Sequence, residues 1–190
     1  MFGWLAARST PLCPHAPQTL LSRRTRRMTP EVLIRHLPGL GSLLYLHATS
    51  SAVVTDALAP GVLVAWRDFA PLLETRWLVA TSVVTDDGPR EWCDCVDRYG
   101  RPRARLHLLP DTDYLAWDAL MSSRGSLDAP PSAWPSGQLL RPDSATIVNF
   151  QVRELAGLML LDREMPVPLS PLGDRVAAHI ASAESAVLSK

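Results

Sequence analysis

The sequence predicts an α+β fold, a large antiparallel β-sheet with flanking helices, and three observations lead to this prediction. Short segments rich in Val, Leu, Tyr and Trp follow one another closely between residues 42 and 108. Little helix-forming sequence separates them, so neighbouring strands are expected to pair antiparallel. Asp86-Asp87-Gly88 and Asp97-Arg98-Tyr99-Gly100 have the composition of tight turns between paired strands.

The first 28 residues differ in composition from the rest of the chain. They contain five arginines, four of them between Arg23 and Arg27, and no acidic residue precedes Glu31. Three prolines interrupt any helix, and the arginines do not lie where a secretory signal would have them. We expect residues 1–28 to form a basic, disordered leader. A basic arm that contacts nucleic acid or anionic lipid is the alternative.

The first half of the remaining chain reads as one helix followed by strands. Thr29-Pro30-Glu31 has the cap, the early proline and the acidic first turn of a helix, which Pro38-Gly39 then ends. Strands are expected at residues 42–49, 52–57, 61–66 and 76–85, with a helical turn at 67–75.

The stretch 90–121 has the clearest local pattern. Residues 90–96 read as a strand, and Pro102 suits the first residue of the next one because proline lacks an N–H. In residues 103–108, Ala104, Leu106 and Leu108 alternate with Arg103, Arg105 and His107 and therefore face the opposite way. A helix capped by Asp111 or Thr112 is expected to run through Met121. Its inward residues are expected to be Leu115, Trp117, Ala119 and Leu120.

The remaining third is less regular. Residues 124–144 are rich in Pro, Ser and Gly, which predicts a linker or a long loop. Residues 145–190 are expected to complete the domain with a strand at 145–152 and a terminal helix at 171–188. That helix spaces Val176, Ile180, Ala183 and Val187 for one face. The apolar run at 157–162 fits either a strand or a helix.

Charge and cysteine content limit the classes of partner. The formal net charge is +0 and the pI is near 7.0, which argues against a general nucleic-acid binder. No apolar run reaches transmembrane length, so no membrane insertion is expected. Three cysteines give no disulfide framework and suit a reducing cytoplasm. Cys93 and Cys95 share one face of a strand, where they are either buried free thiols or part of a soft-metal site.

Five features follow one another without gaps in residues 90–121: a strand, an Asp-x-x-Gly turn, an alternating strand with a basic residue, a capped start and a helix with an aromatic side chain. The matching residues are Cys95-Val96-Asp97, Gly100, Arg105, Leu106, Leu108, Asp113, Ala116, Trp117 and Leu120. This order resembles the repeat unit of the HemS/ChuX haem-utilisation family. The resemblance implies that residues 29–123 form one such α+β repeat, and that the chain binds and traffics haem in the bacterial cytoplasm. A single repeat implies a homodimer.

The chain also departs from the family's pattern. The arginine and the His-Glu pair of the family fall here on Ala48 and on Val54-Thr55. Haem degradation rests on the resemblance alone, so whether the chain is an enzyme stays undecided. The alternative function is a non-catalytic binding or regulatory module of the same fold whose haem site has decayed.

Four residues are candidates for haem binding. Imidazole can coordinate iron and guanidinium can pair with propionates, so the resemblance implies His107 as the iron ligand, beside Arg105 and Arg103. His47 could substitute as a ligand. The alternative is that the first three simply form the solvated face of a half-buried sheet, and that His47 is a partly buried strand histidine.

Overall fold

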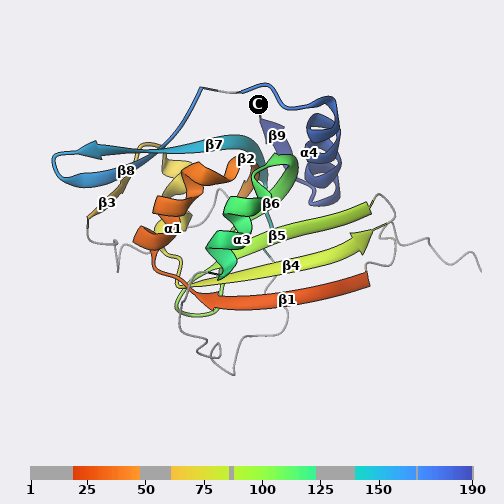
Figure 1. Ribbon diagram of the computed structural model, residues 1–190, viewed down its shortest axis with the longest axis horizontal. Coiled ribbons are helices and arrows are strands. Elements are labelled where there is room, and N and C mark those ends of the chain that lie inside the picture. Colours follow the sequence, from red (N-terminus) through yellow and green to blue (C-terminus); the bar gives the residue numbers. More distant parts are fainter. Residues whose placement is uncertain (1–18, 48–60, 86–87, 123–139, 166, 190) are drawn as a thin grey trace, which may run out of the picture.

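The computed structural model describes residues 19–47, 61–85, 88–122, 140–165 and 167–189. In this part of the chain, nine strands and four α-helices form an α+β fold (Figure 1). The strands are β1 (Thr19–Arg27), β2 (Gly41–His47), β3 (Val62–Val64), β4 (Trp77–Thr85), β5 (Gly88–Val96), β6 (Pro102–Thr112), β7 (Ser144–Leu155), β8 (Leu158–Arg163) and β9 (Val187–Ser189). The helices are α1 (Pro30–His36), α2 (Ala70–Leu73), α3 (Tyr114–Ser122) and α4 (Pro171–Ala183), with 3₁₀ turns η1 (Leu37–Leu40) and η3 (Arg67–Phe69).

One open sheet organises the molecule. Its strands lie in the order β1-β4-β5-β6-β2-β7-β8-β3, and β9 pairs with β7. The described pairings are antiparallel apart from β3 with β8 and β7 with β9. This arrangement confirms the predicted α+β class and its large, mostly antiparallel sheet.

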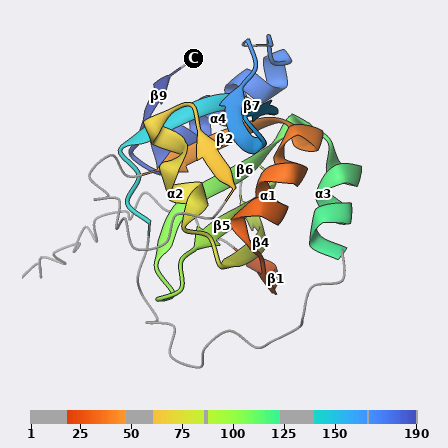
Figure 2. The same cartoon turned by 90° about the vertical axis from the view of Figure 1, so that its left-hand side faces the viewer.

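The larger core fills one face of the sheet. Side chains alternate between the two faces of a strand, so Ala104, Leu106 and Leu108 of β6 lie on this face together with Leu43 and Tyr45 of β2. The helices α1 and α3 cover this face (Figures 1 and 2). Burial of these apolar side chains is the main favourable contribution to folding.

A smaller core fills the opposite face. Leu44 and Leu46 of β2 and Leu109 of β6 meet Ala177 and Ile180 of α4 there. The helix α4 lies against β6 and β9, on the other side of the sheet from α1 and α3. In β5 and β6, the residues that alternate with those of the larger core therefore point toward α4.

The predicted basic leader is shorter than expected. Thr19–Arg27 is strand β1, which pairs with β4 along its length, and Met28 is buried in the larger core. The prediction of a disordered segment over 1–28 is therefore wrong for residues 19–28. This segment forms a strand through long-range pairing with β4. Its own sequence is mostly polar and carries no strand pattern. Residues 1–18 lie outside the described residues.

The first residues of α1 and α3 can be compared with the predicted helix caps. Thr29 caps α1 as expected, since its hydroxyl accepts a hydrogen bond from the Val32 N–H. At α3 the cap is Asp113, whose carboxylate accepts from the N–H groups of Leu115 and Ala116 at 2.9 Å. The predicted caps Asp111 and Thr112 are therefore wrong for this helix.

The inward face of α3 is narrower than predicted. Trp117 and Leu120 are buried as expected. Leu115 is 83% exposed and Ala119 is also exposed, so their assignment to the core is wrong.

The C-terminal part is more strand-rich than the sequence predicted. The apolar run at 157–162 forms strand β8 from Leu158 onward, and the expected strand at 145–152 falls within β7. The terminal helix is shorter than predicted, because α4 ends at Ala183 and Val187 begins β9. The expected strand at 52–57 and most of the expected linker lie outside the described residues. Among the described helices, none has the length and apolar content needed to span a membrane.

Candidate functional site

Arg105 and His107 lie on the face of β6 that α4 covers. The strand register places Trp92 of β5 and Leu44 of β2 beside His107, and Asp94 and Leu46 beside Arg105. Cross-strand neighbours share a face of the sheet. Of the three side chains predicted to share one face of this strand, Arg105 and His107 do so, but this face is not a solvated one.

The guanidinium of Arg105 is enclosed between two carboxylates. Its Nε donates to Asp94 Oδ1 at 2.7 Å, and one terminal nitrogen donates to Glu184 Oε1 at 2.6 Å. Its side chain is 11% exposed and lies over the ring of Trp92, 5.3 Å from the centroid. The two carboxylates together raise the pKa of Arg105 despite its burial. Arg105 therefore stays charged and has its charge balanced within the protein.

The imidazole of His107 is buried between β5 and the end of α4. Its ring is tilted against Trp92 at a centroid distance of 5.6 Å. Glu184 Oε1 lies 3.8 Å from His107 Nε2, which is longer than an ordinary hydrogen bond, and neither ring nitrogen has a hydrogen-bond partner among the described residues. Burial, together with the charge of Arg105, lowers the pKa of His107 although Glu184 opposes this shift. His107 is therefore neutral at pH 7.

Glu184 joins this cluster from the C-terminal end of α4. Burial by itself would raise the pKa of its carboxyl, but His107 and Arg105 lower that pKa overall. Glu184 therefore carries a negative charge at neutral pH. We call Trp92, Asp94, Arg105, His107 and Glu184 the α4-facing polar cluster.

The opposite end of α4 is fixed by a second polar contact. Asp111, near the end of β6, accepts hydrogen bonds from the N–H and the hydroxyl of Ser170, at 2.9 and 3.0 Å. Ser170 is the N-cap of α4 and accepts in turn from the Gly173 N–H at 3.0 Å. A Cβ atom at Gly173 would lie 1.9 Å from Asp111 Oδ2, so a larger residue here would require the Asp111 side chain to move. The helix is therefore held on β6 at both ends.

Arg103 does not join the predicted row of basic side chains. The β5–β6 register skips Arg103, since Cys95 pairs with Ala104 and Val96 with Pro102. Such a bulge interrupts the alternation of faces. Arg103 pairs instead with Glu74 at the end of α2, with Nε 2.9 Å from Oε2.

His47 lies on the opposite face of the sheet from His107. Its cross-strand neighbour is Ala104, which belongs to the larger core, and its ring stacks on Tyr45 at 5.2 Å. The structure therefore does not bring the four predicted residues together, and His47 and His107 cannot contact one ligand plane on the same side. The residues Ala48, Val54 and Thr55 lie outside the described residues.

The two cysteines of β5 are buried on the face of the larger core. Cys93 and Cys95 are fully buried and free, and burial raises the pKa of Cys95 to about 12. A high pKa disfavours the thiolate that binds metals. Within the described ranges, no group of three or more His, Cys, Asp or Glu side chains is placed to hold a metal ion.

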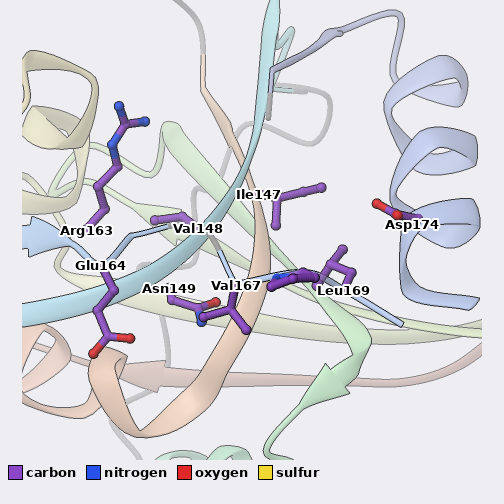
Figure 3. A pocket seen from close by; sticks show the side chains of 9 residues that line it. Ile147, Val148, Asn149, Arg163, Glu164, Val167, Leu169 and Asp174 are labelled. Carbon is purple, nitrogen blue, oxygen red and sulfur yellow. The ribbon is translucent and has the colours of Figure 1, made fainter. Parts of the chain in front are cut away.

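A pocket of about 280 Å³ lies between β7, the chain after β8 and the start of α4 (Figure 3). Its lining residues are Ile147, Val148, Asn149, Arg163, Glu164, Val167, Pro168, Leu169 and Asp174. Small-molecule sites usually have at least this volume. None of the four predicted haem-binding residues lines it, so this pocket does not support the predicted site.

The acidic partners that define the cluster were not predicted from the sequence. Asp94 could have been paired with Arg105 if the register of the hairpin around residues 97–100 had been assigned. Glu184 and Asp111 gave no such signal, because their partners lie 79 and 59 residues away along the chain.

Comparison with protein-family models, with curated protein sequences and with solved structures finds no match for this chain. The resemblance to the HemS/ChuX family therefore stays a prediction. Haem as a cofactor and His107 as its iron ligand stay predictions as well. As arranged, Arg105 and His107 do not fit a haem, since α4 covers them and Arg105 already pairs with two carboxylates.

Proposed function

We propose that this protein is a binding or regulatory module without catalytic activity, in which the α4-facing polar cluster has a structural role. The observation that carries this proposal is the enclosure of Arg105 between Asp94 and Glu184. A guanidinium whose charge is balanced by two carboxylates has little electrostatic attraction left for the carboxylates of a ligand. The cluster then serves to hold α4 against the sheet.

The burial of the cluster supports the same proposal. The side chains of Arg105 and His107 are 11% and 5% exposed, and α4 is fastened at both ends. A ligand that used these two residues would have to displace the helix and leave two carboxylates unpaired. Breaking a buried ion pair in this way costs about 3–5 kcal/mol. Binding by this module is therefore expected elsewhere on its surface.

Titration with hemin tests this proposal. We expect no saturable change in the Soret absorbance at micromolar protein, beyond that given by an unrelated protein of similar size. A saturable Soret shift that is lost in His107→Ala, with the melting temperature of that variant unchanged, would show that the cluster is a haem site.

Haem trafficking in the bacterial cytoplasm is the second candidate, and one observation favours it. Both ring nitrogens of His107 are buried and have no hydrogen-bond partner among the described residues, and an unpaired buried polar group is energetically unfavourable. Coordination of iron would satisfy one of these nitrogens. This function requires α4 to move away from β6, and in the single-repeat form it also implies a homodimer.

Light scattering and limited proteolysis separate the two candidate functions without relying on a spectrum. The haem-trafficking candidate predicts the mass of a dimer at micromolar concentration, and a dimer whose α4 region becomes accessible to proteases when hemin is added. A monomer with unchanged protease cleavage in hemin favours the structural role of the cluster.

A further inference from the structure

We infer that the outer edge of β1 is a docking site for an extended acidic segment of a partner protein, which adds to the sheet as a further strand. Among the described strands, β1 ends the sheet beside β4 (Figure 1). Its nine residues are long for an edge strand, since many edge strands are short. This edge is separated from α4 by β4 and β5, so the inference is independent of what Arg105 and His107 do.

The backbone of β1 offers hydrogen bonds in the outward direction. The Met28 N–H donates to the Arg76 carbonyl at 2.9 Å, and the register continues regularly from Arg27 opposite Trp77 to Ser22 opposite Ser82. Backbone groups alternate between the two sides of a strand. The N–H and carbonyl groups of Arg23, Thr25 and Arg27 therefore point away from β4, where an added strand can pair with them.

The charge of β1 defines the partner. Four of its nine residues are arginines, Arg23, Arg24, Arg26 and Arg27, and none is acidic. Alternation places Arg23 and Arg27 on one face of the sheet and Arg24 and Arg26 on the other. Arg23, Arg24 and Arg27 are exposed. Arg24 lies 3.4 Å from Glu91, and Arg26 is partly buried and donates to the Leu120 carbonyl. An added strand would have Arg23 and Arg27 beside it on one face and Arg24 on the other, and carboxylates opposite them would form favourable cross-strand pairs.

Two other occupants of the edge fit less well. The edge strand of a second copy would bring the same four arginines and no acid. The chain's own segments outside the described residues also fit poorly. Residues 1–18 contain no acid, residues 48–60 contain only Asp56, residues 123–139 contain only Asp128, and the acidic pair Asp86-Asp87 is too short to form a strand beside β1. An acidic segment of another protein fits best. Exposed Leu20 and Leu21, at 59% and 61%, add an apolar contact at the start of the strand.

The mode of binding is strand addition, in which main-chain hydrogen bonds supply affinity and alternate side chains supply specificity. It differs from the binding of a nucleic acid by the same arginines, because nucleic acid needs the charges and does not need the outward N–H groups of β1. This difference defines the experiment.

The probe is a fluorescein-labelled peptide of alternating Glu and Val, as long as β1, and binding is measured by fluorescence anisotropy on the full chain. We expect binding that weakens as salt rises. Thr25→Pro removes one outward N–H and leaves the pairing with β4 intact, so it should weaken binding about tenfold, whereas Thr25→Val should leave binding unchanged. Arg23→Glu should also weaken binding about tenfold, and Arg175→Glu on α4 is the control for net charge.

Two further probes keep the inference testable if Thr25→Pro does not fold. The same peptide with alternate backbone nitrogens methylated should not bind to the wild-type protein, and a Lys–Val peptide should not bind either. Equal binding of the methylated and unmethylated peptides would overturn strand addition. Binding of duplex DNA that depends on Arg23, with no binding of the Glu–Val peptide, would overturn the acidic partner and identify a nucleic-acid surface.

Discussion

Arg105 on β6 and Glu184 at the end of α4 are 79 residues apart in the chain and form an ion pair of 2.6 Å. The same guanidinium bonds to Asp94 on β5, so one side chain joins a hairpin to a helix. With the contact between Asp111 and Ser170 at the other end, this pair holds both ends of α4 on the sheet.

A double-mutant cycle should show that Arg105 and Glu184 stabilise the fold together. We expect Arg105→Met and Glu184→Gln to have a coupling energy of about 1–3 kcal/mol in urea unfolding, as for a partly buried charged hydrogen bond. Arg175→Met, on the exposed side of α4, should show no coupling to Glu184→Gln. A coupling energy for Arg105 and Glu184 indistinguishable from that control would mean that the ion pair does not hold the helix.

The stability of the protein should fall in mild acid because of His107. Its folded pKa lies below its ordinary value of 6.5, so the unfolded chain binds a proton first as the pH falls. The stabilisation is therefore present above pH 6.5 and is lost as the pH falls through the lowered pKa. Glu184, whose pKa is also lowered, acts in the same direction below its ordinary value of 4.5. Melting temperatures measured from pH 5 to 8 should rise with pH at first and level off above pH 6.5.

His107→Gln provides the control for this pH dependence. It removes the buried titrating group, so the rise in melting temperature near pH 6 should become smaller. If His107→Gln keeps the full rise, the pH dependence comes from another group.

Gly173→Ala should destabilise the protein by about 1–3 kcal/mol, because the added methyl group would overlap the Asp111 carboxylate. The cost should be smaller in an Asp111→Ala background, where the overlapping group is absent. Gly39→Ala is the matched control, since its Cβ would meet Ala116 at an ordinary 3.9 Å. Equal melting temperatures for Gly173→Ala and Gly39→Ala would contradict this account of the helix start.

Ala156→Asn should stabilise the β7–β8 hairpin. Ala156 and Gly157 form the turn with φ of 51° and 78°, a conformation that favours Asn followed by Gly. We expect a gain of about 0.5–1 kcal/mol in unfolding free energy, seen as a higher melting temperature. Ala156→Val should lower the melting temperature, since a β-branched residue is disfavoured at positive φ. The reverse order of the two variants would argue against this turn conformation.

The fold class followed from local sequence because the strands, turns and first helix carry their own signals. Asp97 shows this well. It accepts hydrogen bonds from the N–H groups of Tyr99 and Arg101, and Gly100 has a φ of 80°, as a tight turn requires. By contrast, β1 has no strand pattern of its own and forms because β4 offers it a partner along its whole length.

Only part of the site could be predicted, because contacts between distant segments leave no pattern in the local sequence. The alternation in β6 placed Arg105 and His107 on one face, and no local pattern could show that α4 covers that face. Arg103 was misplaced because a bulge shifts the register at that residue. His47 was misplaced because the face of β2 depends on how it pairs with β6.

Hemin titration of the wild type and of Glu184→Gln, side by side, tests the central claim most directly. The claim is that α4 and its acidic partner Glu184 close the cluster around Arg105 and His107. It predicts no saturable Soret change for the wild type. Glu184→Gln should respond more strongly than the wild type if loosening α4 exposes His107. A saturable one-to-one Soret shift in the wild type, unchanged by Glu184→Gln and abolished by His107→Ala, would contradict it.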